Sequence, residues 1–361
     1  MKPKIVSIFS GAGGMDVGFE TAGFQTVFAT DIWAISCNSL EKNFPKATVV
    51  CDDIQNIDFK KVLTKHETID GLVGGPPCPP FSKSRFYRTE KNRGIDDADG
   101  FMTVSNYFRA VEELQPKFFL FENVHGFVFS PHKSALEMVE RESTRLGYKI
   151  FHQVMNAADF GVPQTRQRFI CIGIKNGLGD FGFPKQTHSA PNIKAPNTND
   201  WITCGDVISD IDIEREEDSK MVAGSKHKEL LKEIPPGDNY LFFTKERGNP
   251  NPIFKWRSRY WSFLLKLSPN RPSWTIQASH SNNMGPFHWN NRFLRIQEIK
   301  RIQTFSDDYI LAGSFKDQWR QIGNAVPPEL ARVLAASLLK QYFNGRETMV
   351  DRKIELQYGQ S

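Results

Sequence analysis

"KIVSIFSGAGGMDVGFETAGF", residues 4–24, is the stretch that decides the fold. An apolar run typical of a buried strand leads directly into closely spaced glycines, and a helical pattern follows. Glycines at such a junction let a ligand approach the backbone where the helix begins. The stretch therefore predicts a strand–turn–helix unit with a binding site at the turn.

The same alternation continues along the chain to residue 174. Helical patterns lie at 33–44, 101–114 and 132–146. Further apolar runs typical of strands lie at 25–30, 47–53, 70–75, 117–123, 149–157 and 168–174. Short strands separated by helices predict an α/β fold with a doubly wound, mostly parallel sheet.

The remaining chain suggests a second, smaller domain. Prolines, asparagines and polar residues interrupt the alternation over 175–290, and helical patterning returns over 292–343. We predict a catalytic and ligand-binding domain over 1–175, a smaller irregular domain over 176–290, a return to the first domain over 291–345 and a polar tail over 346–361.

Composition excludes several classes of protein. The chain has 361 residues, 39% hydrophobic and 24% charged, which is ordinary for a soluble globular protein. No apolar run is long enough for a bilayer, and the first one is too short for a signal peptide, so we expect a cytoplasmic protein without membrane association. Five widely spaced cysteines without a CxxC pair argue against a disulfide framework and a structural zinc site, and we expect no metal.

Positive charge is concentrated in one segment. Residues 240–301 contain eleven Lys or Arg against Glu246 and Glu298, although the net charge of the whole chain is only +5. Aromatic residues alternate with these bases, as in "FKWRSRYW", residues 254–261. A basic, aromatic-rich segment is typical of nucleic-acid binding, although a solvated charged face is an equally good interpretation of the charge alone.

The glycine turn can be tested against two kinds of ligand. Asp31 follows the turn by about 20 residues, where an acid can bind ribose hydroxyls in a dinucleotide site. That pattern requires another glycine where this chain has Asp16, whose carboxylate would repel a pyrophosphate. S-adenosylmethionine has a ribose and a cationic centre but no phosphate, so it is the better candidate. A purely structural turn is the alternative.

Reactive side chains occur beside three further predicted strands. Cys78 lies in "GGPPCPPFSKSR", residues 74–85, Glu122 in "FENV" and Arg166 with Arg168 in "QTRQR". If they converge at the edge of the sheet, the thiolate could act as a nucleophile and the acid as a proton donor. Taken singly, each could be a core thiol, a helix-start residue or a surface charge.

These segments together resemble the bacterial-type DNA cytosine-5 methyltransferase family over roughly residues 4–343. Eight blocks occur in that family's order: "SIFSGAGG", "ATDIW", "CDDI", "GGPPCPPFS", "FENV", "QTRQRFICIGI", "RPSWTI" and "RIQTFSDDY…RQIGNAVPP". The resemblance implies a Rossmann-like, S-adenosylmethionine-dependent methyltransferase in which residues 176–290 recognise the DNA target.

The resemblance also implies roles for individual residues. Cys78 corresponds to the nucleophile that attacks carbon 6 of cytosine, Glu122 to the acid at N3, Arg168 to the contact with O2, and Arg166 to the first arginine of its catalytic block. The implied cofactor contacts are Phe9, Gly11, Gly13, Asp31, Ile32, Asp53, Asn324 and Ala325. Residue 79 is a proline, whereas the family commonly has a glutamine there. This difference leaves open the conformation of the loop that follows.

Two segments are expected to contact DNA. Residues 80–100 should form a lid that closes on DNA, with Ser82, Lys83 and Arg85 as contacts. In the variable region we expect contacts from Arg257, Arg259, Arg271 and Arg292. Basic side chains in such proteins contact DNA phosphates more often than the edges of the nucleobases.

The sequence thus predicts a sequence-specific methyltransferase of duplex DNA. We expect a monomer that serves as the modification enzyme of a restriction–modification system, with a cognate endonuclease acting separately. One alternative is an RNA cytosine methyltransferase, but its Cys-Phe-Thr signature is missing, because Cys204 in "TCGD" is the only cysteine in 176–290. A non-catalytic DNA-binding protein and an NAD-dependent oxidoreductase are the others.

Overall fold

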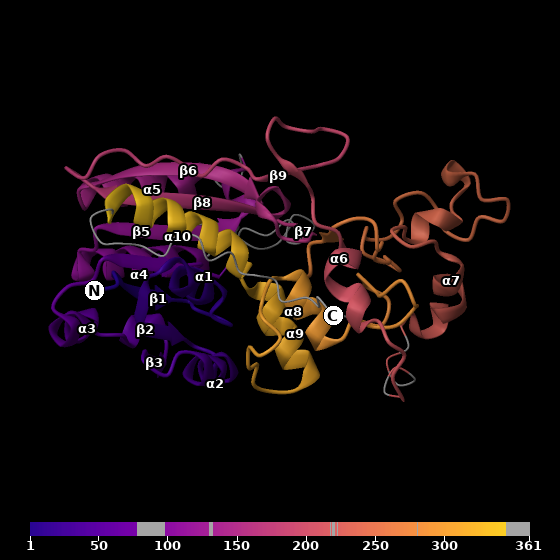
Figure 1. The fold of residues 1–361 in the computed structure, drawn as a ribbon, viewed down its shortest axis with the longest axis horizontal. Coiled ribbons are helices and arrows are strands. Elements are labelled where there is room, and N and C mark those ends of the chain that lie inside the picture. The colour runs from indigo at the N-terminus through magenta and orange to yellow at the C-terminus, as the bar shows by residue number, and fades with distance from the viewer. Residues whose placement is uncertain are drawn as a thin grey trace.

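The computed structural model describes residues 1–77, 98–129, 133–216, 218, 221, 223–279 and 281–343. Its centre is a seven-stranded sheet with the strand order β3-β2-β1-β4-β5-β8-β6 (Figure 1). The strands are β1 (Lys4–Ile8), β2 (Gln25–Asp31), β3 (Thr48–Cys51), β4 (Gly71–Gly74), β5 (Phe118–Val124), β6 (Tyr148–Asn156) and β8 (Gln167–Lys175).

The sheet is parallel from β3 to β5, whereas β8 runs antiparallel to both of its neighbours. Reversal of β8 brings its first residues to the edge where β5 ends, with Arg168 paired to Val124. The predicted doubly wound, mostly parallel sheet is confirmed. Arg166 follows the end of β6, and Arg168 lies at the beginning of β8, as the predicted strands 149–157 and 168–174 imply.

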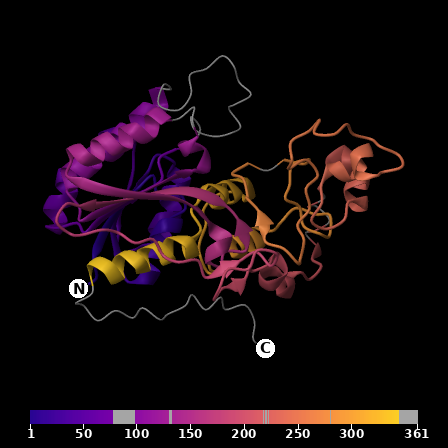
Figure 2. The same ribbon diagram turned by 90° about the horizontal axis from the view of Figure 1, so that it is seen from above.

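Helices cover both faces of the sheet. The chain forms α1 (Gly14–Ala22), α2 (Ala34–Asn43), α3 (Phe59–His66), α4 (Ala98–Leu114), α5 (Lys133–Arg145) and α10 (Pro328–Tyr342). One apolar core joins the sheet to α3, α4 and α5, and a second joins its other face to α1 and α10. Figure 2 shows the sheet between these two helical layers. Helix α3 was not predicted, because its few apolar residues lie among lysines.

The chain outside this sheet has short elements and cores of its own. The elements are β7 (Gln164–Thr165), β9 (His188–Ser189), β10 (Asn199–Asp200), β11 (Ser273–Trp274), α6 (Cys204–Ile208), α7 (Lys228–Glu233), α8 (Ile296–Ile302) and α9 (Phe315–Asn324). One core contains buried residues between Ala223 and Phe287. Another joins α6, α8 and α9 to apolar residues beside the glycine turn, among them Ala12 and Leu40.

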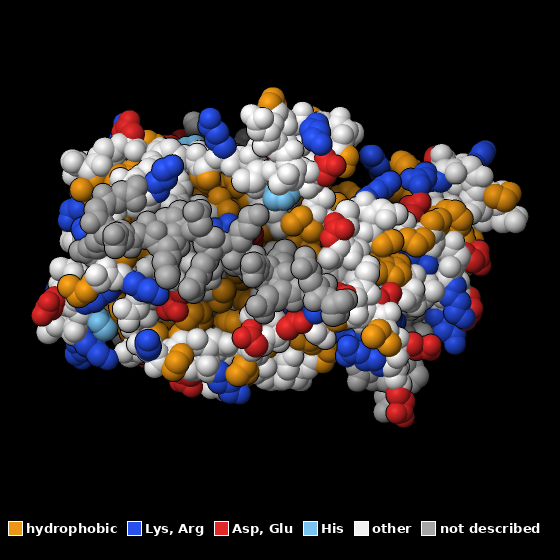
Figure 3. Space-filling model, viewed as in Figure 1, with side chains coloured by type: hydrophobic (Ala, Val, Ile, Leu, Met, Phe, Trp, Pro, Cys, Tyr) orange, Lys and Arg blue, Asp and Glu red, His pale blue; other side chains and the backbone are white. Residues whose placement is uncertain are grey.

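The part of the chain between β8 and α8, here called the second lobe, exposes both charged and apolar side chains. Figure 3 shows Lys, Arg and hydrophobic side chains together on one of its faces. Within the described ranges, no helix is long and apolar enough to cross a membrane.

Candidate active site and cofactor site

The turn after β1 has an open position for a ligand. Phe9, Gly11 and Gly13 have positive φ angles of 53°, 55° and 73°, a conformation that glycine adopts readily. A side chain added at Gly11 would have no atom within 4 Å, so the space in front of its backbone is free. At Gly13 the added carbon would meet Leu40, Phe44 and Tyr309 at 2.8–2.9 Å, so this glycine is required by close packing.

Asp31 connects the end of β2 to this turn. Its carboxylate accepts hydrogen bonds from the N–H of Gly11 at 2.8 Å and of Trp33 at 2.9 Å. Burial raises the pKa of Asp31, although these two donors and the charge of Arg320 oppose the rise. Each oxygen retains acceptor capacity, so ribose hydroxyls could still bind there. The arrangement fits the sugar of S-adenosylmethionine.

The other predicted cofactor residues lie at neighbouring strand ends. Ile32 is 68% exposed, which leaves its side chain free to contact a flat ring. Strand β3 ends beside β2, with Cys51 paired to Asp31. Two residues later, the Asp53 side chain accepts a hydrogen bond from the N–H of Gln55 at 2.9 Å and caps a short helical turn.

Asn324 and Ala325 reach the same place from the end of α9. A side-chain carbon at Gly14 would lie 3.3 Å from the Ala325 methyl group and would collide with the carbonyl of Val326. The backbone of 323–325 is held by Arg166, which donates to the carbonyls of Gly323 and Ala325 at 2.9 Å each. Residues far apart in sequence therefore meet beside the glycine turn.

These contacts correct the role expected for Arg166. Its side chain is buried, and it also donates to the carbonyl of Ile276 at 3.1 Å. A guanidinium surrounded by backbone carbonyls holds the C-terminal segment against the sheet. Arg166 is therefore a positioning residue and not a group that touches the substrate.

The predicted catalytic acid, Glu122, lies on β5. Glu122 forms an ion pair with Arg168 at 2.8 Å, and their side chains are only 9% and 12% exposed. Burial raises the pKa of Glu122, and the charges of Arg168 and Arg166 oppose the rise. A carboxyl with a raised pKa retains a proton more readily and can donate it.

The strand that leads to Cys78 lies beside this pair. A side chain added at Gly75 would come within 2.7 Å of the Glu122 carboxylate, so only glycine fits there. The Asn123 amide donates to the carbonyl of Pro76 at 3.4 Å and positions the proline segment. Cys78 itself, Pro79, Ser82, Lys83 and Arg85 lie outside the described residues, as does the predicted lid except for 98–100, where α4 begins.

The acid at the glycine turn does not face a ligand. Asp16 is fully buried and accepts hydrogen bonds from the hydroxyls of Ser7 at 3.0 Å and Thr26 at 3.4 Å. Burial raises its pKa to about 7. The argument that this carboxylate would repel a pyrophosphate is therefore wrong, since the side chain points into the protein.

The remaining arginines predicted to bind DNA differ in environment. Arg257, Arg259 and Arg271 are exposed. Arg271 lines a cavity of about 480 Å³ with Trp201 and Trp274. Arg292 is only 5% exposed and pairs with Glu298 at 2.6 Å and Asp212 at 3.1 Å. The prediction that Arg292 contacts DNA is therefore wrong, because its guanidinium is enclosed by carboxylates.

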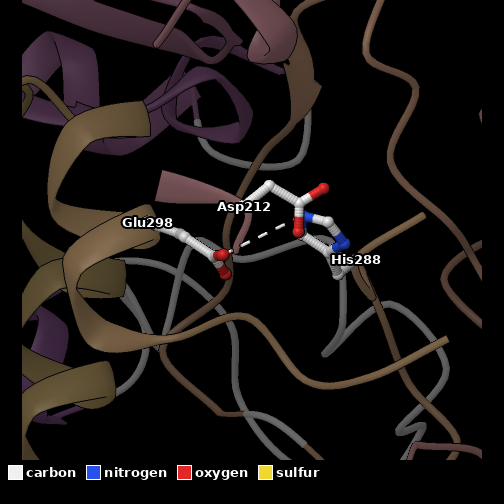
Figure 4. Close-up of side chains that lie close together, drawn as sticks. All are labelled: Asp212, His288 and Glu298. Carbon is white, nitrogen blue, oxygen red and sulfur yellow. Dashed lines mark ion pairs between the residues drawn. The ribbon is translucent and has the colours of Figure 1, made fainter. Parts of the chain in front are cut away.

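Arg292 belongs to a buried charged cluster, of which Figure 4 shows Asp212, His288 and Glu298. In it, the His288 Nε2 lies 3.4 Å from Asp212 and 3.8 Å from Glu298. His288 Nδ1 accepts a hydrogen bond from the N–H of Asn290, so the neutral ring carries its proton on Nε2, facing these acids. Burial, with Arg292 and Arg295 nearby, lowers the pKa of His288 to about 3. These contacts favour a structural link between residues 212–292 and α8 over a metal centre.

Two supporting residues were missed from the sequence. Tyr309 donates to the carbonyl of Ala12 within the glycine turn, and Asn123 holds Pro76. Both lie in quoted blocks, "FSDDY" and "FENV", and that position was the only signal available. Their partners are distant in the chain, so their contacts depend on the tertiary structure.

Comparison with known proteins gives consistent matches. The family model described as C-5 cytosine-specific DNA methylase matches residues 3–340. Type II methyltransferase M.SacI of Streptomyces achromogenes is 35% identical, with 96% of this chain and 95% of that protein aligned. Type II methyltransferase M.NgoFVII of Neisseria gonorrhoeae is 32% identical over 96% of this chain and 89% of its own.

Solved structures share the fold. A putative DNA modification methyltransferase encoded within an E. coli prophage has a TM-score of 0.69 at 22% identity, covering 94% of this chain and 99% of its own. The Dnmt2 methyltransferase of S. pombe has a TM-score of 0.65 at 16% identity, covering 94% and 99%. At these identities the likeness establishes the architecture alone.

Proposed function

The chain belongs to the C-5 cytosine-specific DNA methylase family and is a DNA cytosine-5 methyltransferase, and we propose that it acts through a covalent bond between Cys78 and a cytosine flipped out of duplex DNA. Methyltransferases that modify a base remove it from the helical stack first. The observation that carries the proposal is the buried Glu122–Arg168 pair beside Gly75, from which the chain continues to Cys78.

The residue types suit the chemistry of cytosine. Carbon 5 of the aromatic ring is a weak nucleophile. Addition of the Cys78 thiolate to carbon 6, with a proton donated by Glu122 to N3, makes the ring enamine-like and carbon 5 reactive. Arg168 holds O2 and stabilises charge on the ring. After methylation, loss of the proton on carbon 5, departure of the Cys78 thiolate and return of the N3 proton to Glu122 restore the aromatic ring.

We propose that Gly11, Gly13, Asp31, Ile32, Asp53, Asn324 and Ala325, with Phe9, hold S-adenosylmethionine. When bound, this molecule supplies the methyl group as an electrophile. The free space in front of Gly11 and the acceptor capacity of Asp31 support the assignment. The buried position of Asp16 removes one argument against NAD, but the cysteine, glutamate and arginine set has no role in hydride transfer.

We further propose the biological setting. Relatives named as type II methyltransferases, 35% and 32% identical over nearly the whole chain, support the role of a modification enzyme with a separately acting endonuclease. In this setting the protein works as a cytoplasmic monomer on duplex DNA, and residues 176–290 recognise one target sequence. Cys204 as the only cysteine of that segment weighs against the RNA alternative.

Transfer of labelled methyl groups to duplex DNA and to tRNA tests the proposal. The wild-type protein should label cytosine in DNA, and Cys78→Ala should abolish labelling, because the variant lacks the thiolate that would add to carbon 6. The control Cys204→Ala removes a buried thiol remote from Glu122 and should retain transfer. Undiminished transfer by Cys78→Ala would refute the covalent mechanism.

A second measurement tests the bond directly. In a duplex containing 5-fluorocytosine, the fluorine cannot leave carbon 5 as a proton does, so the enzyme should remain attached to DNA. We expect a protein–DNA complex that survives denaturation for the wild type and Cys204→Ala, and none for Cys78→Ala.

A further inference from the structure

Residues 253–261, here called the aromatic–basic turn, form an exposed surface on the second lobe. Ile253, Trp256, Tyr260 and Trp261 are 53%, 40%, 65% and 48% exposed, which is unusual for large apolar side chains that lie so close together. Lys255, Arg257 and Arg259 are also exposed, and the turn contains no acidic residue. Its chemistry suits a partner that offers both negative charge and flat apolar rings.

The cations of the turn are available to such a partner. Among the described residues, no acid forms an ion pair with Lys255, Arg257 or Arg259, in contrast to the enclosed Arg292. Both guanidiniums lie near rings: Arg257 is 5.8 Å from the centre of the Trp256 ring, and Arg259 is 5.9 Å from that of Phe263. Free guanidiniums beside aromatic rings are typical of nucleic-acid surfaces.

Two buried polar side chains form hydrogen bonds with the backbone of the turn. The Tyr240 hydroxyl donates to the carbonyl of Arg259 at 2.9 Å and accepts from its N–H at 3.1 Å. The Asn239 amide donates to the carbonyl of Trp261 at 2.7 Å. Tyr240 and Asn239 are 1% and 0% exposed. This support fixes which way Arg259 and its neighbours project.

The backbone conformation of Arg257 also suggests that the turn has a function. Its φ angle of 53° lies in the left-handed region, which a side chain disfavours. Backbone of this kind persists only where surrounding contacts enforce it, and it occurs preferentially at functional sites.

The turn is connected to the strand beside the active site. The Trp261 ring lies 5.4 Å from the ring of Trp274, which is itself 47% exposed. Trp274 lies in β11, which pairs with β7 so that Trp274 is opposite Thr165. Arg168, the partner of Glu122, follows Thr165 by three residues. Aromatic contacts thus lead from the turn toward the place where the target base would react.

We propose that the aromatic–basic turn reads the DNA sequence around the target cytosine and that Tyr240 is its positioning residue. The inference rests on the proposed function and specifies which part of residues 176–290 discriminates between sequences. Arginine pairs with the edge of guanine through two hydrogen bonds, and such readout needs a backbone held in place. Trp256 and Tyr260 supply apolar contact beside it.

The decisive variant is Tyr240→Phe, because it keeps the packed ring and removes only the hydroxyl. The target is first identified by bisulfite sequencing of plasmid DNA methylated by the wild type. The ratio of kcat/KM for that target to kcat/KM for a site with one base pair changed is then measured. We expect this ratio to fall about tenfold, within the range for loss of one base contact.

Tyr148→Phe is the matched control. Its hydroxyl also donates to a carbonyl, that of Pro116 at 2.6 Å, and its side chain is 3% exposed, but it lies on the sheet edge. Both variants should lose similar stability, whereas only Tyr240→Phe should lose discrimination. A fall in both would indicate general destabilisation and would overturn the positioning role.

Arg257→Ala and Arg259→Ala test the turn without disturbing its support. At least one should reduce discrimination between sequences, whereas Lys245→Ala, an exposed cation outside the turn, should not. Wild-type discrimination and DNA affinity in both arginine variants would overturn the inference and assign the surface to another partner, such as a protein. Site-specific methylation by the wild type in the same assay would show that the proposed function still stands.

Discussion

Two buried carboxyls in this protein have raised pKa values but opposite surroundings. Glu122 lies at the edge of the sheet with Arg168 as its charged partner. Asp16 lies between β1, β2 and α1, where hydroxyls are its only described side-chain partners. Burial alone therefore does not identify a catalytic acid; a charged partner at an accessible edge does.

Asp16 should make stability depend on pH. Its pKa is 3.8 in the unfolded chain and about 7 when folded, so the stabilisation from this group is present below pH 3.8 and is lost as pH rises through about 7. Asp16→Asn removes this dependence. We expect the free energy of unfolding of the variant to rise by about 3 kcal/mol relative to that of the wild type between pH 4.5 and pH 8, measured by urea unfolding. A constant difference across pH would contradict the assigned burial.

At the scale of elements, the first and last helices of the sheet domain pack through small residues. A side-chain carbon at Gly18 in α1 would meet the carbonyl of Pro328 and, at 2.5 Å, the methyl group of Ala331 in α10. This close approach also keeps Asn324 and Ala325 against the glycine turn. The contact between α1 and α10 therefore brings residues 324–325 beside the turn that follows β1.

Gly18→Ala should therefore destabilise the protein. In an exposed helix the same change would stabilise by roughly 1 kcal/mol, but here overpacking should reverse the sign and cost about 1–3 kcal/mol. Gly182→Ala is the control, since its nearest neighbour would be the Gln341 side chain at 3.6 Å. Thermal unfolding compares the two, and a stabilised Gly18→Ala would show that α1 and α10 lie further apart.

At the scale of the whole molecule, a charged cluster links residues 210–292 to α8. Asp212, Asp218, His288 and Arg292 come from that stretch, and Arg295 with Glu298 from the start of α8. Arg301 continues the link through Asp210 at 2.7 Å. Helix α8 in turn packs in the core that contains Ala12. The cluster thus joins residues 210–292 to the core beside the glycine turn.

Arg292→Ala should be strongly destabilising, because it leaves the buried Glu298 without its closest cation. We expect a loss of about 3–5 kcal/mol in urea unfolding. Arg145→Ala, which breaks an ion pair with Glu112 whose side chains are about half exposed, should cost roughly 1 kcal/mol or less. Equal losses in the two variants would show that Arg292 is not enclosed as described.

The sequence by itself determined the alternation of strands and helices, the turn with its free glycine, and the choice of Glu122 and Arg168 as groups that meet. These features depend on local periodicity, on glycine at strand ends and on short blocks, all of which are written in neighbouring residues. The predicted helix over 132–146 is an example, since α5 spans Lys133–Arg145.

Only the tertiary structure decided which charges face a ligand and which face the protein. Arg166 and Arg292 were expected to be site residues, and Asp16 was expected to face a ligand at the turn. Their partners are buried around them, in one case 159 residues away. The antiparallel direction of β8, which brings Arg168 to Glu122, is likewise a long-range property. A side chain's type is local, whereas its solvation and its partner are set by residues that folding brings together.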